Sequence, residues 1–195
     1  MLKENLKDYT LILASASPRR HQFFKEMELE FEVRLKSVEE IYPSELKAAE
    51  ISDYLAKLKA SAFKNELEAK DILITSDTVV WHKNESLAKA ANDTEAENML
   101  KKLSGDWHQV ITSVCFTTME RQIILNSITE VKFKNLTPEE IRFYIEKFTP
   151  FDKAGAYGIQ EWIGLIGIEE IKGSYTNVVG LPTQLVYETL TKIIE

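Results

Sequence analysis

The chain has 195 residues, of which 44% are hydrophobic and 28% charged, with seven glycines and five prolines. This composition is typical of a compact protein with a buried core and excludes a disordered chain. Its formal net charge of -7 argues against a nucleic-acid partner, because nonspecific binding to nucleic acid depends on many basic contacts. No apolar run approaches the roughly 20 residues of a membrane span, so we expect no membrane insertion.

Cysteine content and the first residues bear on location. Cys115 is the single cysteine, so the chain has no internal disulfide framework. Residues 1–5 show no signal-peptide hydrophobic region. We therefore expect a reducing, cytoplasmic location.

Strand and helix signals alternate along the chain without repeats. Short apolar or period-2 runs predict strands, and apolar stripes at helical spacing predict helices. The expected strands are 9–13, 31–35, 72–74 with 79–81, 109–117 and 122–133, the last two joined by a hairpin near 119–120. The expected helices are 19–27, 44–65, 93–103, one from the capping box at 137–140 to about 147, and a last one from about 182. The pattern predicts one α/β unit over residues 1–195, compact or bilobed.

The junction at residues 13–20 joins the first strand to a helix through two serines and two arginines. Pro18 suits the first turn of a helix, whose free N–H groups and dipole favour an anion. Arg19 and Arg20 add planar, bidentate phosphate recognition. These features predict a phosphate-binding site. The alternative is a simple helix cap with solvent-exposed arginines.

A carboxylate interrupts an otherwise apolar strand signal at Asp77. Such an acid is costly to bury unless it is paired or binds a cation, and the alternative is a bulge or turn at 75–78 that exposes it. Glu39 or Glu40, in the loop after 31–35, offers a second carboxylate. Hard oxygen ligands of this kind suit Mg²⁺ or Mn²⁺. The three histidines lack zinc spacings and are expected to be structural or surface residues.

A third block, at 152–160, surrounds a tyrosine with two glycines and two alanines and ends in Gln160. Small residues let backbone approach a ligand closely, although a flexible turn is the alternative. The amide of Gln160 can donate and accept in one plane, as the reading of a nucleobase edge requires. The glycine- and hydroxyl-rich segment 173–182 is expected to line the same site.

Five segments together resemble the motifs of the Maf family of nucleotide pyrophosphatases. They lie in the family's order and reach from near the N-terminus to the last helix; they are 11–20, 76–80, 103–105, 152–160 and 178–182. The resemblance implies hydrolysis of nucleoside triphosphates to monophosphate and pyrophosphate, with a divalent metal, as house-cleaning of nucleotide pools. It also implies a mixed α/β fold like that of inosine triphosphatases, with a long twisted sheet flanked by helices and a central cleft between two lobes.

The form of the third block, Lys-Ala-Gly-Ala-Tyr-Gly-Ile-Gln, is similar to the branch that prefers dTTP and UTP, with modified pyrimidine nucleotides as further candidates. By resemblance, Asp77 matches the catalytic carboxylate, described as the proton acceptor. Arg19, Thr78 and Gln160 match positions linked to substrate specificity. The remaining matches to pocket residues are Ser15, Arg20, Glu40, Lys59 and Lys89. Asp77 and Glu40 are the expected metal ligands.

Three departures from the family pattern affect the expected substrate more than the expected reaction. The family's Gly-Lys-Pro is Ala88-Lys89-Ala90 here, which changes the loop around the lysine. Asp106 stands after Ser104-Gly105, where the family has a basic or polar residue. Glu161 replaces a glycine beside Gln160, where a carboxylate is expected to disfavour an anion or to shift base preference.

Two other readings stay open at this stage. One is a catalytically impaired nucleotide-binding regulator of septum formation, whereas a link to arrest of cell division belongs to the enzyme reading. The other is a nucleic-acid-associated module, which the net charge disfavours. If the chain is an enzyme, the expected partner is its nucleoside triphosphate substrate. A homodimer would be unsurprising for a small cytoplasmic enzyme.

Overall fold

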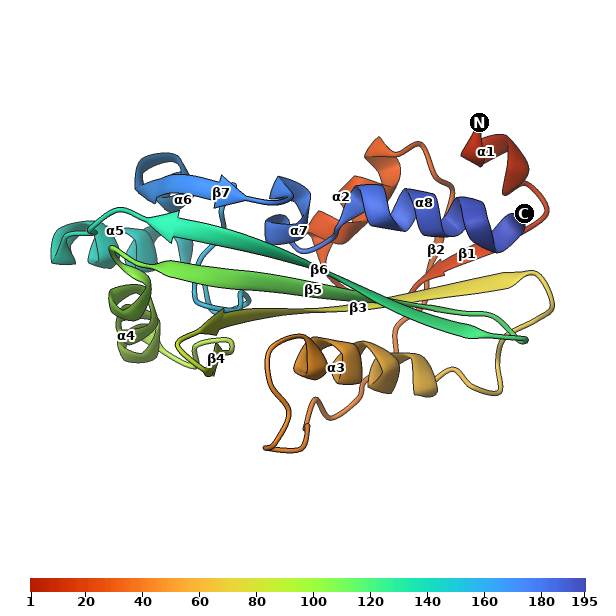
Figure 1. Cartoon of the computed structure of the whole chain (residues 1–195), viewed down its shortest axis with the longest axis horizontal. Helices are drawn as coiled ribbons and strands as arrows, with labels where there is room; N and C mark the ends of the chain where they lie inside the picture. The colour runs from red at the N-terminus through yellow and green to blue at the C-terminus, as the bar shows by residue number, and fades with distance from the viewer. The chain divides into compact units, whose positions relative to one another are not determined.

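The computed structural model describes residues 1–195 as a mixed α/β protein of eight helices and seven strands (Figure 1). The helices are α1 Leu2–Asn5, α2 Pro18–Glu26, α3 Ala49–Ser61, α4 Asp93–Leu103, α5 Pro138–Phe148, α6 Trp162–Gly167, α7 Tyr175–Val179 and α8 Thr183–Ile194. The strands are β1 Thr10–Leu13, β2 Glu32–Val33, β3 Asp71–His82, β4 Glu85–Leu87, β5 Trp107–Thr117, β6 Gln122–Phe133 and β7 Ile168–Lys172. No helix is long and apolar enough to cross a membrane.

All seven strands belong to one sheet, in the order β2-β1-β3-β5-β6-β7, with β4 paired to β3. β1 runs parallel to β2 and β3, whereas the pairs β3–β4 and β6–β7 are antiparallel. A tight turn joins β5 to β6, where the Thr118 N–H donates to the Arg121 carbonyl at 2.9 Å. The predicted class, a mixed sheet flanked by helices, is confirmed.

The chain divides into two compact units. Unit 1 contains residues 1–77, 112–127 and 180–195, and unit 2 contains 78–111 and 128–179. The three long strands β3, β5 and β6 each contribute residues to both units. The single Maf-like domain over 1–195 and the cleft between two lobes stay predictions.

Unit 1 buries both faces of its part of the sheet. Ile72 and Ile74 of β3 share a hydrophobic cluster with Phe24 of α2 and with residues of α8. Leu73, which points to the opposite face, belongs to a second cluster with residues of α3. Figure 1 shows α2 and α8 on one side of these strands and α3 on the other. Burial on both faces explains why the strand reads as a continuous apolar run.

Unit 2 has a core of its own, built from α4, α5, the second half of β3 and the segment after α5. The capping box at Thr137 and Glu140 is present and starts α5, as the sequence predicts. Ala156 and Tyr157 are buried in this core. The backbone of the third sequence block is therefore fixed by packing, and Gln160 stands at its exposed end.

Several element boundaries differ from the predictions. The strand expected at 31–35 is only two residues long, and the helix expected at 44–65 is α3 alone. Ala48 precedes α3 with φ 48°, which a right-handed helix does not accommodate. β3 runs without interruption from residue 71 to 82 and Asp77 is 7% exposed, so the alternative of an exposing turn at 75–78 is wrong.

Candidate active site

The strand-to-helix junction of unit 1 is tied to its neighbours by backbone and serine contacts. The Ala14 N–H donates to the Ile74 carbonyl at 2.9 Å. Ser15 Oγ accepts from the Ser17 N–H at 3.2 Å, which folds the junction into a tight turn. α2 begins at Pro18, and Ser17 makes no side-chain cap. The segment therefore does not form the serine side-chain cap that was the alternative.

Arg20 joins three sequence motifs with one guanidinium. Its Nε donates to the Gly180 carbonyl at 2.9 Å, and its Nη1 donates to the Ser76 carbonyl at 2.9 Å and to Ser15 Oγ at 3.3 Å. Burial lowers the pKa of Arg20, and the carboxylates of Asp77 and Glu40 oppose that effect. An arginine so placed keeps its charge and fixes the backbone around the junction.

His21 supports the same junction from α2. Its Nε2 lies 2.5 Å from the Ser15 carbonyl oxygen. Because a carbonyl only accepts, Nε2 carries the hydrogen. The other histidines are also hydrogen-bonded, His82 to Asp106 and His108 to Tyr157. The expectation that the histidines are structural or surface residues is consistent with these contacts.

Lys59 of α3 brings two acids of unit 1 together. Its Nζ lies 2.6 Å from Asp77 Oδ1 and 3.1 Å from Glu40 Oε1. Asp77 is thus the paired buried carboxylate that the sequence predicts, and the partner is a lysine 18 positions earlier. The ammonium group thus links the buried carboxylate of β3 to the loop that carries Glu40.

No group of three or more His, Cys, Asp and Glu residues gathers where it could hold a metal ion. Asp77 and Glu40 nevertheless both contact a single cationic group, the Lys59 ammonium. Mg²⁺ is usually bound by one or two carboxylates together with waters and substrate phosphates. These two acids therefore fit a divalent ion that also takes oxygens from a ligand.

Unit 2 carries the other residues that the sequence points to. Thr78 is half-buried at the first position of unit 2, and Lys89 and Gln160 are exposed. Lys89 forms an isolated β-bridge with Ala154, and the Gly155 N–H donates to the Leu87 carbonyl at 2.9 Å. The loop around Lys89 is therefore held by the third block without the glycine and proline of the family motif.

Glu161, one of the departures from the family motif, is paired rather than free. Its Oε1 lies 3.1 Å from the Nζ of Lys153, and its Oε2 accepts from the Tyr144 hydroxyl. Burial raises the pKa of Tyr144, and the hydrogen bond to Glu161 raises it further. Lys153 is 8% exposed and also pairs with Asp152 at 2.6 Å. The negative charge of Glu161 is thus offset within unit 2.

Asp106, another departure, has a structural role. It accepts from Lys83 at 2.6 Å, from His82 at 3.1 Å and from the Trp107 N–H at 2.8 Å. The Lys83 contact and then the His82 contact hold its pKa well below the usual range. These partners stabilise the turn before β5.

The structure places the predicted residues in two sets. Unit 1 holds Ser15, Arg19, Arg20, Glu40, Lys59 and Asp77, and unit 2 holds Thr78, Lys89 and Gln160. A hydrogen bond joins Arg20 to Ser15, and Lys59 joins Asp77 to Glu40. Arg20 also interacts electrostatically with Asp77, Glu40 and its neighbour Arg19 in α2. Sequence reasoning missed the supporting residues His21, Tyr144 and Lys153. Only Lys153, inside the third block, carried any signal.

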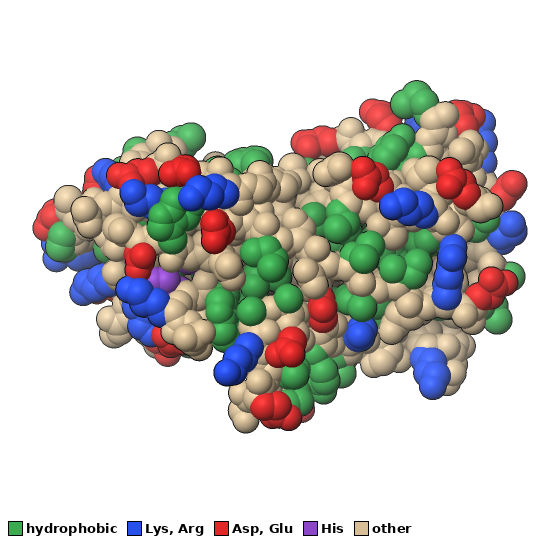
Figure 2. Space-filling view, viewed as in Figure 1, with side chains coloured by type: hydrophobic (Ala, Val, Ile, Leu, Met, Phe, Trp, Pro, Cys, Tyr) green, Lys and Arg blue, Asp and Glu red, His purple; other side chains and the backbone are tan.

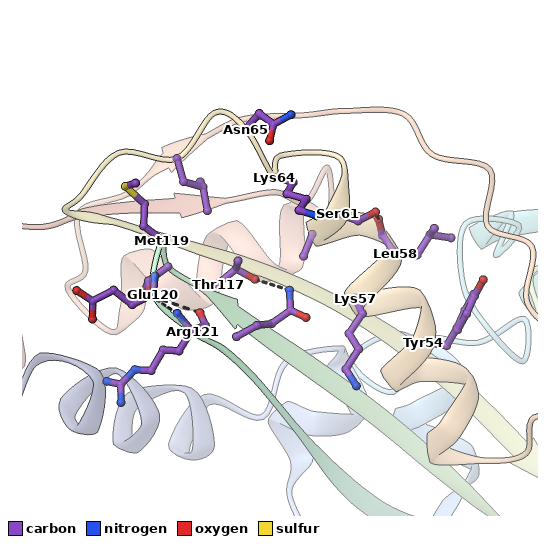
Figure 3. Close-up of a pocket in the computed structure, with 14 residues that line it drawn as sticks. Tyr54, Lys57, Leu58, Ser61, Lys64, Asn65, Thr117, Met119, Glu120 and Arg121 are labelled. Atoms are coloured by element: carbon purple, nitrogen blue, oxygen red, sulfur yellow. Dashed lines mark hydrogen bonds between the residues drawn. The ribbon is translucent and has the colours of Figure 1, made fainter.

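A cavity of about 980 Å³ also lies in unit 1, between α3 and the β5–β6 turn (Figure 3). Figure 3 labels lining residues from α3, among them Lys57 and Leu58, and from the β5–β6 turn, among them Met119 and Glu120. Neither Lys59 nor Asp77 lines this cavity. On the face drawn in Figure 2, acidic and basic side chains are mixed, and no extended basic stripe is visible.

The fold is similar to that of a solved structure, the Ham1 protein of Staphylococcus aureus. The two share 17% identity with a TM-score of 0.55, over 94% of this chain and 99% of that one. This likeness shows the fold class, a mixed α/β protein of the Ham1 type.

Residues 10–193 match the model of the family described as Maf-like protein, and the chain belongs to that family. A relative from Flavobacterium johnsoniae is 57% identical over 100% of both chains. One from Flavobacterium psychrophilum is 57% identical over 96% of both, and one from Christiangramia forsetii is 50% identical over 100% of this chain and 99% of its own. All three bear the name dTTP/UTP pyrophosphatase. The resemblance to the Maf family is confirmed.

Proposed function

We propose that this chain hydrolyses dTTP and UTP to the nucleoside monophosphate and pyrophosphate. The observation that carries the proposal is the cluster of Asp77, Lys59 and Glu40 in the same unit as the Ser15–Arg20 junction. Support comes from relatives of that name, at 50 to 57% identity over nearly the whole chain.

Asp77 acts as the proton acceptor in this proposal. The water that cleaves the α–β anhydride bond gives its proton to the Asp77 carboxylate, and pyrophosphate leaves with the bonding electron pair. Lys59 pairs with Asp77 in the free enzyme and holds its carboxylate in place. A carboxylate that is fixed before the substrate arrives needs little reorganisation in the reaction.

The triphosphate is bound by the cationic and hydroxyl groups. Ser15, Arg19 and Arg20 present donors at the start of α2, where the helix dipole favours an anion. Lys59 and Lys89 add charge for the leaving pyrophosphate. Local cationic groups of this kind explain how a chain of net charge -7 binds a polyanion.

Asp77 and Glu40 would hold Mg²⁺ or Mn²⁺ together with phosphate oxygens. A bound divalent ion lowers the pKa of a water ligand and offsets charge on the phosphates. Both carboxylates contact the Lys59 ammonium, at 2.6 Å for Asp77 and 3.1 Å for Glu40.

Arg19, Thr78 and Gln160 select the base and sugar. A buried hydrogen-bond match can discriminate strongly, because a wrong base leaves its partners unpaired. Uracil, thymine and modified uracils share the O4 and N3–H edge, so modified pyrimidine nucleotides belong to the proposed substrate range.

The cellular setting in this proposal is cytoplasmic house-cleaning of nucleotide pools, by a homodimer, with a link to arrest of cell division. Each of these statements rests on family resemblance or on general features of the chain. They stand apart from the reaction itself and do not affect its test.

Asp77→Asn tests the proposal, with pyrophosphate release from dTTP and UTP measured in Mg²⁺. The amide keeps the size of the side chain and loses its basicity, so kcat falls about 10³-fold. Asp8→Asn, at an exposed acid of unit 1, is the matched control and keeps wild-type turnover. Full activity of Asp77→Asn would refute the assignment. A wild-type protein that binds dTTP without releasing pyrophosphate would instead be a nucleotide-binding regulator.

A further inference from the structure

The amide of Gln160 poses a problem of orientation. Its side chain is exposed and makes no hydrogen bond to another residue. A glutamine amide can pair with uracil or thymine, through N3–H and O4, and after a 180° flip it can pair equally well with cytosine, through N3 and N4–H. An unrestrained Gln160 would therefore not separate UTP from CTP.

Glu161 is held firmly beside this amide. Lys153 contacts one carboxylate oxygen at 3.1 Å and the Tyr144 hydroxyl donates to the other. The Gly158 N–H in turn donates to the Tyr144 oxygen at 3.0 Å. Glu161 is also the N-cap residue of α6, directly before the first helical residue, Trp162. These contacts fix both the backbone and the carboxylate at this position.

The side chains of Gln160 and Glu161 approach each other in the space next to Gly158, which has no side chain of its own. A methyl group added to Gly158 would lie 3.0 Å from Gln160 Nε2 and 3.0 Å from Glu161 Oε2. The NH₂ end of the Gln160 amide thus shares the space over Gly158 with a carboxylate oxygen. A carboxylate attracts the NH₂ end of an amide and repels its oxygen, so this arrangement is the lower in energy.

We propose that Glu161 is a specificity-determining residue, which orients the Gln160 amide with Nε2 inward and Oε1 free to accept N3–H from uracil or thymine. Cytosine presents an unprotonated N3 at that point and is rejected. The inference rests on the proposed function, because it assigns Gln160 to the base. Within it, Lys153 and Tyr144 are positioning residues that act through Glu161.

Glu161→Gln tests the inference. The variant keeps the length of the side chain and an acceptor for Tyr144 but loses the charge that orients the amide. We expect the ratio of kcat/KM for UTP to that for CTP to fall about tenfold, chiefly because CTP turnover improves. The ratio is measured in one preparation, so a loss of folded protein cancels. Glu169→Gln, at an exposed acid of unit 2, is the matched control and keeps the wild-type ratio.

Calorimetric binding of the imido analogues of UTP and CTP gives a readout without turnover. An unchanged preference in Glu161→Gln, in both turnover and binding, would overturn the inference. If the wild-type protein releases no pyrophosphate but prefers the UTP analogue, and the variant loses that preference, the inference holds and the proposed reaction fails. If the wild-type protein binds both analogues equally, the inference fails whatever the result for turnover.

Discussion

The two units hold their candidate residues in opposite ways. In unit 1 the side chains contact one another: Arg20 donates to Ser15, and Lys59 joins Asp77 to Glu40. In unit 2 the side chains of Lys89 and Gln160 are exposed, and the backbone beneath them is fixed instead. Groups that bind phosphate and accept a proton profit from a fixed arrangement, whereas groups that read a base must be free to pair with it. Damage to the contacting side chains of unit 1 should therefore reduce rate, and loss of the exposed Gln160 amide of unit 2 should change selectivity.

Arg20→Lys makes the strongest test of this comparison. Lysine keeps the charge but cannot donate at once to the Gly180 and Ser76 carbonyls, which are 2.9 Å from two different nitrogens of Arg20. Loss of two charge-assisted hydrogen bonds predicts a fall in kcat/KM for dTTP of about 100-fold. Steady-state kinetics measure the effect, and Arg34→Lys, at a surface ion pair of unit 1, serves as the control. Wild-type kinetics in Arg20→Lys would show that the fixed junction is not needed.

Gln160→Ala should have a smaller effect of a different kind. Removal of the amide raises KM for UTP and leaves kcat close to the wild-type value, because the groups of unit 1 remain intact. The ratio of kcat/KM for UTP to that for CTP falls about tenfold. Adding Glu161→Gln to this variant should change the ratio no further, since both substitutions act on one amide. A fall in kcat as large as that of Asp77→Asn would break the division between the two units.

The sequence predicts elements well where a local rule decides the structure. The capping box places the start of α5 at Pro138, and the glycine at 105 marks the end of α4. The prediction from sequence fails where a single backbone angle sets a helix boundary. The positive φ of Ala48 makes α3 start later than predicted. The sequence of β7, Ile-Glu-Glu-Ile-Lys, does not alternate as a half-buried strand would. These residues form a strand only because they pair with β6.

In the candidate site, too, the sequence predicts features that follow a local rule and misses those that do not. Asp77 can be predicted because a carboxylate inside an apolar run needs a partner. Its partner Lys59 could be named only by resemblance, since no local pattern relates two residues on a helix and a strand. The contacts of Arg20 with the carbonyls of Ser76 and Gly180 leave no signal in the sequence at all, because every residue has a carbonyl.

His108 gives the smallest and most local of the expected effects, and it concerns stability. It lies in the core of unit 2, with Nε2 2.6 Å from the Tyr157 hydroxyl and its ring stacked on Phe133. Burial, and then the charge of His82, lowers the pKa of His108 to about 3, while Asp106 opposes the shift. Its Nδ1 has no hydrogen-bond partner, so a proton there would leave an unpaired charged N–H in the core.

Because the folded state resists this proton, the unfolded chain binds it first as the pH falls. The contribution of His108 to stability is therefore complete above the ordinary histidine pKa of about 6.5 and is lost as the pH falls from there towards 3. Between pH 8 and pH 6 the free energy of unfolding should decrease by about 1 kcal/mol through this residue. Urea unfolding at the two pH values measures the change, and His108→Gln, which cannot titrate, should remove it. Hydrogen exchange at pH 6 should rise first in residues 155–159 of unit 2, which surround Tyr157, and an equal rise around β1 and α2 would contradict the separation of the two cores.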